Sequence, residues 1–225
     1  MKRWLSAVTA LTLTLLAACP AFALPDEVWR EGSAPPAVVL PGSAPFGDIG
    51  GHWASDGITW CYNRGLLLGT GPGVFSPDEP MTRGVFLTAL GRLEGVDPSL
   101  YPGSPFPDVS AGSSYAPYAS WAKARGLIQG REDGAFDAHE PITRQEMAAL
   151  VSRYLDRQPP PYDGFLGYLD AHTISPWAIE SVECVRRMGL MDGYPDGTFD
   201  PFATITRGEC AVLLQRLAGL RYPEV

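Results

Sequence analysis

Three Thr-Arg steps are the part of this sequence that points most directly to binding chemistry. They are Thr82-Arg83, Thr143-Arg144 and Thr206-Arg207. In the second and third steps a glutamate, Glu146 or Glu209, follows the threonine by three residues, which is the pattern of a helix capping box. The arginine then lies in the first helical turn, where a cation faces the positive end of the helix dipole. Capping therefore explains the threonine and the glutamate but not the arginine.

Two interpretations of these arginines remain open. An arginine fork beside free backbone N–H groups is suited to bind a carboxylate, such as an acidic substituent of a sugar. In that case replacing Arg83, Arg144 or Arg207 with Ala should weaken binding and leave folding nearly intact. In the other interpretation each arginine forms a salt bridge with an aspartate of a neighbouring repeat. The candidate aspartates are Asp48, Asp108 and Asp170.

Aromatic residues at the start of an expected helix form the second candidate group. Trp53 and Trp177 lie twelve residues before a glycine, whereas the matching position of the middle copy is Ser114, with Tyr115 beside it. A flat indole can stack on a sugar, but a tryptophan at a helix start is also commonly half-buried packing. Both roles remain open, and Ser114 indicates that the copies do not bind equally. We expect Trp60 and Trp121 to be packing residues.

Composition and motifs argue against several other functions. The net charge of −8 argues against nucleic acid as a partner, because phosphate binding needs a basic surface. The sequence lacks the Gly-x-Ser-x-Gly, His-Glu-x-x-His and phosphate-loop motifs, and its three histidines fall outside the recurring pattern. A loop from residue 192 resembles a calcium loop, but Tyr194 and Ala203 occupy ligand positions. We expect no catalytic, cofactor or metal site.

These candidate residues recur because the chain contains three copies of one unit. Each copy opens with an aromatic-x-Asp step, continues through Gly-Leu-x-x-Gly and reaches the Thr-Arg step 17 residues after the first glycine. The copies span residues 46–96, 106–155 and 168–220, and are called the first, second and third modules below.

Each module is predicted to contain two helices that position the candidates. The first runs from Trp53, Tyr115 or Trp177 to the glycine pair; a turn and a short helix follow, and the last helix begins at the threonine. A unit of about 50 residues cannot bury its own apolar faces well. We therefore expect an all-α fold: three helix–turn–short helix–helix repeats packed as one pseudo-threefold, three-pronged domain, and a monomer.

Residues 1–23 are predicted to be an export signal. Lys2 and Arg3 precede an apolar run, and Ala21-Phe22-Ala23 matches a cleavage site. The run is shorter than the roughly 20 apolar residues of a membrane span, and no later stretch approaches that length. Residues 24–45 form a Pro-, Ala- and Gly-rich linker.

The cysteines leave two questions open. Leu16-Ala17-Ala18-Cys19 also resembles the box that precedes a lipoprotein cysteine, so Cys19 is either removed or acylated. Cys61, Cys184 and Cys210 fall on apolar helix faces, where they are expected to be buried thiols. A bond between Cys184 and Cys210 remains possible in an oxidising compartment.

The ordered pattern of the modules resembles the S-layer homology module, repeated three times. The third module matches best, with Asp196-Gly197-Thr198-Phe199-Asp200-Pro201 followed by Ile205-Thr206-Arg207-Gly208-Glu209. The first departs most, because Val85 replaces the glutamate and Gly71-Pro72-Gly73 replaces the Asp-Gly turn. The resemblance implies a domain that anchors exported proteins to the bacterial wall by binding secondary wall polysaccharide, often with a pyruvate ketal on N-acetylmannosamine.

The expected protein is therefore an exported, non-catalytic anchor at the cell wall or S-layer surface, bound to an acidic or pyruvylated glycan. The candidate polysaccharide-binding residues are Arg83, Arg144, Arg207, Asp48, Asp108, Asp170, Trp53, Tyr115 and Trp177. The alternative is a surface adaptor, attached to lipid through Cys19, whose modules contact other proteins.

Overall fold

The computed structural model describes residues 44–155 and 166–221, which form six α-helices and two short 3-10 helices. They are α1 (Ser55–Asn63), α2 (Arg83–Leu93), η1 (Pro98–Leu100), α3 (Ala116–Ala124), α4 (Arg144–Tyr154), η2 (Ala171–Thr173), α5 (Ile179–Arg187) and α6 (Arg207–Arg221). None of the helices in these two ranges is long and apolar enough to cross a membrane. The expected leader with Cys19, and the linker up to residue 43, lie outside the described residues.

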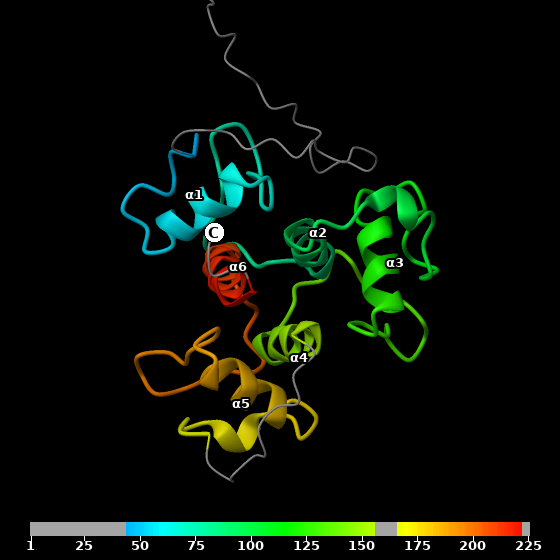
Figure 1. Cartoon of the computed structure of the whole chain (residues 1–225). Helices are drawn as coiled ribbons and strands as arrows, with labels where there is room; N and C mark the ends of the chain where they lie inside the picture. The colour runs from blue at the N-terminus through cyan, green and yellow to red at the C-terminus, as the bar shows by residue number, and fades with distance from the viewer. Residues whose placement is uncertain (1–43, 156–165, 222–225) are drawn as a thin grey trace, which may run out of the picture.

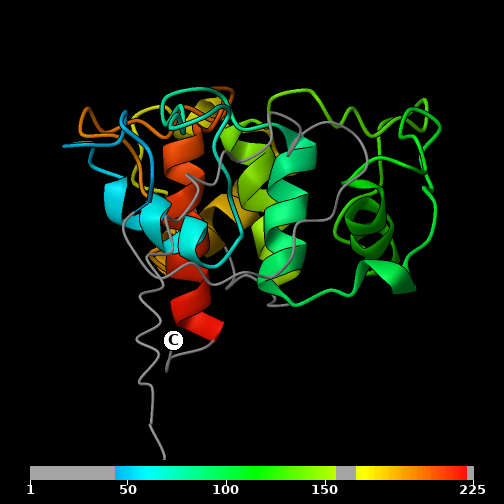
Figure 2. The ribbon, with the colours of Figure 1, turned by 90° about the horizontal axis from the view of Figure 1, so that it is seen from above.

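The helices form three prongs around a central group (Figure 1). Helices α2, α4 and α6, which begin at the Thr-Arg steps, stand side by side in the centre, and α1, α3 and α5 lie outside them (Figures 1 and 2). The pairing crosses module boundaries: α1 packs on α6, α3 on α2 and α5 on α4. Each prong is therefore built from the first helix of one module and the last helix of another.

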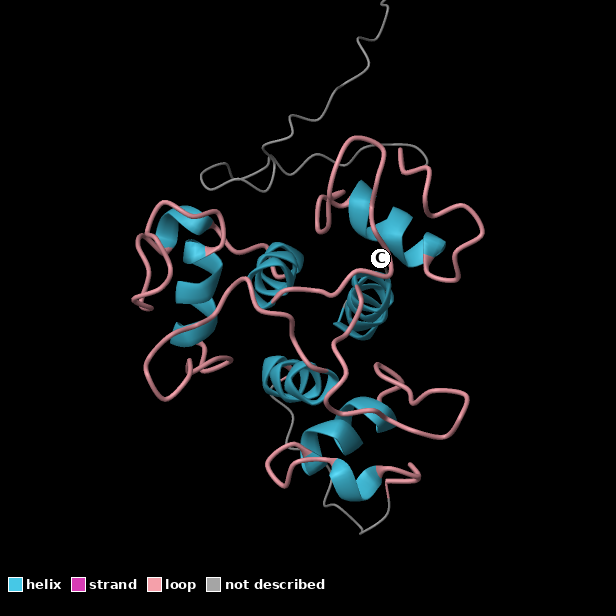
Figure 3. Cartoon of the chain, turned by 180° about the vertical axis from the view of Figure 1, so that it is seen from behind, coloured by secondary structure: helices cyan, strands magenta, loops and turns pink. Residues whose placement is uncertain are grey.

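A closed cycle of backbone hydrogen bonds joins the three modules where the central helices begin. Met81 N donates to Ile205 O at 2.8 Å, Ile205 N to Ile142 O at 3.1 Å, and Ile142 N to Met81 O at 3.0 Å. All three side chains are at most 1% exposed. The segments that carry them converge between the three helices (Figure 3). The modules thus complete one another as a single body, as their size predicted.

The helix boundaries follow the expected signals. The glycines that end the first helices, Gly65, Gly126 and Gly189, have φ values of 65°, 69° and 64°, so the left-handed stop is confirmed. Helix α4 begins with a complete capping box, and the same two hydrogen bonds join Thr206 and Glu209 at the start of α6. At α2 the Thr82 side chain accepts no capping hydrogen bond, and Val85 at the glutamate position has no carboxylate to accept one from the Thr82 N–H.

The short helix expected before each Thr-Arg step is absent from the described residues, and that prediction is wrong. Residues 66–82, 127–143 and 190–206 form turns and isolated bridges, while η1 and η2 lie elsewhere. The residue after each module's phenylalanine has a positive φ, between 53° and 57°, which a right-handed helix cannot accommodate. These residues are Ser76, Asp137 and Asp200.

The cysteines are buried, as expected. Cys61, Cys184 and Cys210 are free thiols, so Cys184 and Cys210 are not bonded to each other. Cys61 donates to the carbonyl of Ala211 at 3.5 Å across the contact between α1 and α6. Burial raises the pKa of Cys61 and Cys210, so both remain protonated packing residues at neutral pH.

The second glycine of each Gly-Leu-x-x-Gly segment lies under the aromatic residue that opens its module. A Cβ on Gly69 would lie 2.7 Å from Cε1 of Phe46 and closer still to the carbonyl of Val74. On Gly193 it would lie 2.5 Å from Cε1 of Tyr168 and 2.6 Å from the carbonyl of Thr198. The second glycine is therefore required by close packing.

We predict that Gly69→Ala lowers the free energy of unfolding by about 1–3 kcal/mol, because backbone must shift to admit the methyl group. Gly71→Ala is the matched control, since a Cβ there has no neighbour within 4 Å, and should change stability by less than about 0.5 kcal/mol. Urea unfolding of both variants measures the difference. Equal midpoints would contradict the packing argument.

Candidate functional site

The three candidate aspartates bind the backbone of their own module's loop. Asp48 accepts hydrogen bonds from the N–H groups of Phe75 at 3.0 Å and Ser76 at 2.7 Å. Asp108 and Asp170 make the same pair of bonds, at 2.7–2.8 Å, to Phe136 and Asp137 and to Phe199 and Asp200. Burial alone would raise the pKa of Asp48 and Asp108, but these hydrogen bonds lower it below the usual value.

Arg207 approaches the same loop from the other side. Its Nε donates to the carbonyl of Phe75 at 2.9 Å and its Nη2 to the carbonyl of Leu68 at 2.7 Å. The guanidinium lies over the Phe75 ring, 4.5 Å from its centroid, and Arg207 is 6% exposed. Burial lowers the pKa of Arg207 to about 10, so it remains charged at neutral pH. The backbone of Phe75 is thus held by Asp48 and Arg207 from two different modules.

The other two arginines repeat this contact. Arg144 Nε donates to Phe199 O at 2.7 Å, and Arg83 Nε donates to Phe136 O at 2.9 Å. In the described part of the chain the three arginines form no ion pair with the candidate aspartates, so the salt-bridge interpretation is wrong. Arginine and aspartate instead bind opposite sides of the same loop.

The N–H groups at the helix starts are not free, which corrects the premise of the anion-receptor interpretation. In α6, Arg207 N and Gly208 N donate to the carbonyls of Glu79 and Pro77 at 2.9 and 2.8 Å. The first two N–H groups of α2 and α4 likewise bind carbonyls of the next module's loop. Because neighbouring loops occupy these donors, a ligand cannot use them.

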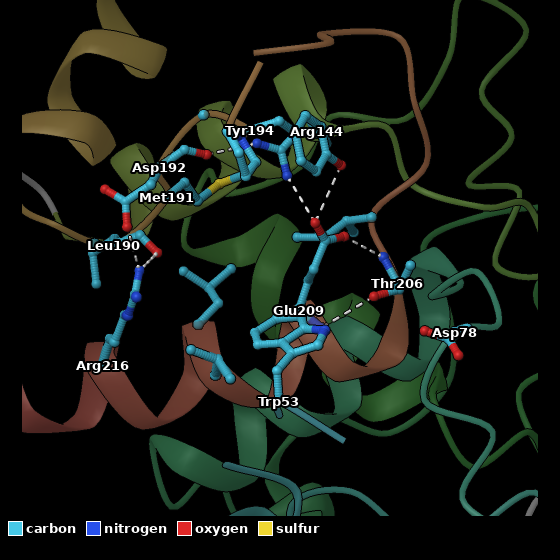
Figure 4. A pocket seen from close by; sticks show the side chains of 15 residues that line it. Trp53, Asp78, Arg144, Leu190, Met191, Asp192, Tyr194, Thr206, Glu209 and Arg216 are labelled. Carbon is cyan, nitrogen blue, oxygen red and sulfur yellow. Dashed lines mark hydrogen bonds and ion pairs between the residues drawn. The ribbon is translucent and has the colours of Figure 1, made fainter. Parts of the chain in front are cut away.

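A groove lies between α6 and the loop 190–195, with Trp53 at its edge (Figure 4). Its volume is about 530 Å³, and we call it the Trp53 groove. Trp53 is 64% exposed. Glu209 Oε1 accepts from Arg144 Nη1 at 3.1 Å and from the Tyr194 hydroxyl at 3.2 Å. The groove therefore combines an exposed indole with an ordered set of polar groups.

A second groove occupies the equivalent place one module earlier. It lies between α4 and the loop 127–130, has a volume of about 190 Å³ and is called here the Trp177 groove. Trp177 is 55% exposed. Arg83 and Glu146 line it at the positions that Arg144 and Glu209 hold in the Trp53 groove. Each groove thus takes side chains from all three modules.

The structure separates the candidate residues into two groups. Trp53 with Arg144, and Trp177 with Arg83, line the grooves. Arg207, Tyr115 and the three aspartates line neither one. Tyr115 is half-buried, and its hydroxyl lies 3.0 Å from Nε2 of His139.

The expected packing tryptophans lie away from the grooves. Trp121 is 3% exposed, and Trp60 is half-buried under the guanidinium of Arg64, 4.2 Å from the ring centroid. Both are packing residues, as predicted.

The sequence also contains a further signal for groove residues, which the Thr-Arg steps and the aromatic positions do not include. An arginine follows each threonine by ten residues, at Arg92, Arg153 and Arg216. Arg216 and Arg153 line the two grooves and donate to carbonyls at the end of their module's first helix. Asp192 and Tyr194, which also line the Trp53 groove, do not recur in the other modules and carried no such signal.

We predict that Arg207→Ala lowers the free energy of unfolding by about 3 kcal/mol, because it leaves two carbonyls without a charged donor. These contacts revise the expectation that folding stays nearly intact. Arg125→Ala, at an exposed position, is the control and should be close to neutral. Thermal unfolding of both variants is the measurement. A wild-type melting temperature for Arg207→Ala would show that its contacts contribute little.

Comparison with known proteins agrees with this architecture. The S-layer homology domain matches residues 45–84, 105–148 and 167–211. Similar proteins include an amylopullulanase of Thermoanaerobacterium thermosulfurigenes, 30% identical over 76% of this chain and 9% of that enzyme. A cellulosome-anchoring protein of Acetivibrio thermocellus is 29% identical over 67% of this chain and 35% of that protein. An S-layer protein of Bacillus thuringiensis subsp. finitimus is 27% identical over 73% and 20%.

The chain spans only a minor part of the length of these relatives, from 9% to 35%. The enzymatic activity of the amylopullulanase is therefore not transferred to it. The family match covers more than half of the 225 residues and coincides with the three modules. The chain belongs to the S-layer homology domain family.

Proposed function

We propose that this chain is a non-catalytic module that anchors an exported protein at the bacterial cell surface by binding wall polysaccharide in its two grooves. The observation that carries the proposal is the repeated pairing of an exposed tryptophan with an arginine and a glutamate in each groove. Two relatives, named as a cellulosome-anchoring protein and an S-layer protein, support the surface role.

The groove chemistry suits a sugar chain. An exposed indole offers a flat face on which a pyranose can stack, and Trp53 and Trp177 lie at the groove edges. The polar groups beside them are held in place by mutual hydrogen bonds, as Glu209 is by Arg144 and Tyr194. A volume of about 530 Å³ falls within the usual range of small-ligand sites.

The third module junction has different residues and is not proposed as a site. Val85 holds the position of Glu146 and Glu209, and Ser114 holds that of Trp53 and Trp177. Both the polar anchor and the stacking surface are replaced there. We propose two binding sites for each chain, with the chain acting as a monomer.

We predict that the purified chain binds wall sacculi and loses that binding after hydrofluoric acid has removed the secondary polysaccharide. A co-sedimentation assay measures the bound fraction. Equal binding to stripped and intact sacculi would contradict polysaccharide recognition and indicate contact with peptidoglycan itself.

We predict that Trp53→Ala and Trp177→Ala each weaken sacculus binding about tenfold, because stacking on an aromatic side chain is worth about 1 kcal/mol or more. The double variant should lose binding almost entirely. Leu100→Ala is the control: Leu100 is 71% exposed and lines neither groove. If the control lost as much binding as the tryptophan variants, the grooves would not be the binding sites.

A further inference from the structure

The two grooves are built alike but differ in charge. In the Trp53 groove Arg144 and Arg216 face three carboxylates. These are Asp78, Asp192 and Glu209. In the Trp177 groove Arg83 and Arg153 face the single carboxylate of Glu146. One groove thus has a formal charge of −1 and the other of +1.

The position of Asp192 accounts for half of this difference in formal charge. Asp192 accepts a hydrogen bond from Arg216 Nη1 at 2.9 Å, and its negative charge offsets the positive charge of Arg216. The equivalent residue of the second module, three after the first glycine, is the exposed and uncharged Gln129. Arg153 donates instead to the carbonyl of Leu127 at 3.2 Å, and a carbonyl does not cancel its charge.

The arginines at the inner end of the grooves, Arg144 and Arg83, also make the Trp177 groove the more favourable one for an anion. Arg144 is 3% exposed and donates three hydrogen bonds, one of them to Glu209. The side chain of Arg83 is 15% exposed, and its Nη1 pairs with Glu146 Oε1 at the longer distance of 3.5 Å. Arg83 is therefore more exposed than Arg144 and is held by fewer short hydrogen bonds, which makes it the more accessible arginine for an anionic ligand.

A residue at the groove edge accounts for the other half of the difference in formal charge. Asp78, whose side chain is 85% exposed, lines the Trp53 groove four residues before Thr82. The equivalent residue of the third module, four before Thr206, is Phe202, which is uncharged and 60% exposed. An anion approaching the Trp53 groove therefore meets a carboxylate that has no counterpart at that position of the third module.

We propose that the two grooves divide the polymer by charge. The Trp177 groove binds a sugar with an anionic substituent, such as a pyruvate ketal, and the Trp53 groove binds an uncharged stretch of the same chain. The position held by Asp192 in one groove and Gln129 in the other supplies half of the charge difference on which this division depends. This proposal rests on the polysaccharide-binding function proposed above.

Reciprocal substitution at this position tests the division. The probes are two synthetic disaccharides of N-acetylmannosamine that differ only in a pyruvate ketal, titrated by calorimetry. The wild type should bind one equivalent of the ketal form, with an affinity that falls as salt is added. Gln129→Asp should weaken ketal binding about tenfold by placing a carboxylate beside Arg153. Asp192→Gln should add a second equivalent of ketal binding.

Matched variants separate charge from shape. Gln129→Asn shortens the side chain without adding charge, and Asp192→Glu alters its length but keeps the charge. Neither should change the preference between the two disaccharides. Loss of the Asp192–Arg216 pair should leave the fold intact, because both side chains are exposed and an exposed ion pair contributes little to stability.

The outcomes distinguish the two proposals. If both disaccharides bind, but Gln129→Asp weakens both equally or Asp192→Gln adds no ketal site, the division by charge is overturned while polysaccharide binding stands. If the wild type binds neither disaccharide and does not bind intact sacculi, the proposed function fails and the charge division with it.

Discussion

The architecture depends on how the backbone of one phenylalanine in each module is held. The N–H of Phe75 binds Asp48 of its own module, and its carbonyl binds Arg207 of the third. The Phe75 ring is fully buried under the guanidinium of Arg207. Backbone carbonyls take the place of water as hydrogen-bond acceptors for this buried charge. Breaking either contact would leave a buried polar group without a partner, which is costly. Three such clamps hold every module to another.

The clamp also explains why the grooves are well formed. Arg144 fixes the loop that follows α5 through the carbonyls of Phe199 and Asp192, and its Nη1 binds Glu209 in the groove wall. The side chains that make the interface between modules thus also shape the ligand site. For this reason the effects of substituting Arg144 on stability and on binding must be measured separately.

Much of the fold could be predicted from local patterns. Gly65 and the Thr143–Glu146 box mark helix ends because their signals depend on residues a few positions apart. The helix on which each first helix packs could not be predicted. The apolar face of a helix such as α1 shows that the helix is covered, but it does not show which module provides the cover. For the site, Trp53 and Trp177 were identified because a repeat reveals equivalent positions. Asp192 could not be predicted because it differs from the equivalent residues of the other modules. Its role is visible only in the structure, where it pairs with Arg216.

The crossed pairing of helices sets a rule for how such a protein can evolve. Because α1 of the first module completes its prong on α6 of the third, the ring closes only when the last module meets the first. Deletion or duplication of a single module would leave an unmatched outer helix and an uncovered central one. Copy number in this fold is therefore expected to change in whole sets of three, so that a gene can gain or lose an entire ring but not a fraction of one.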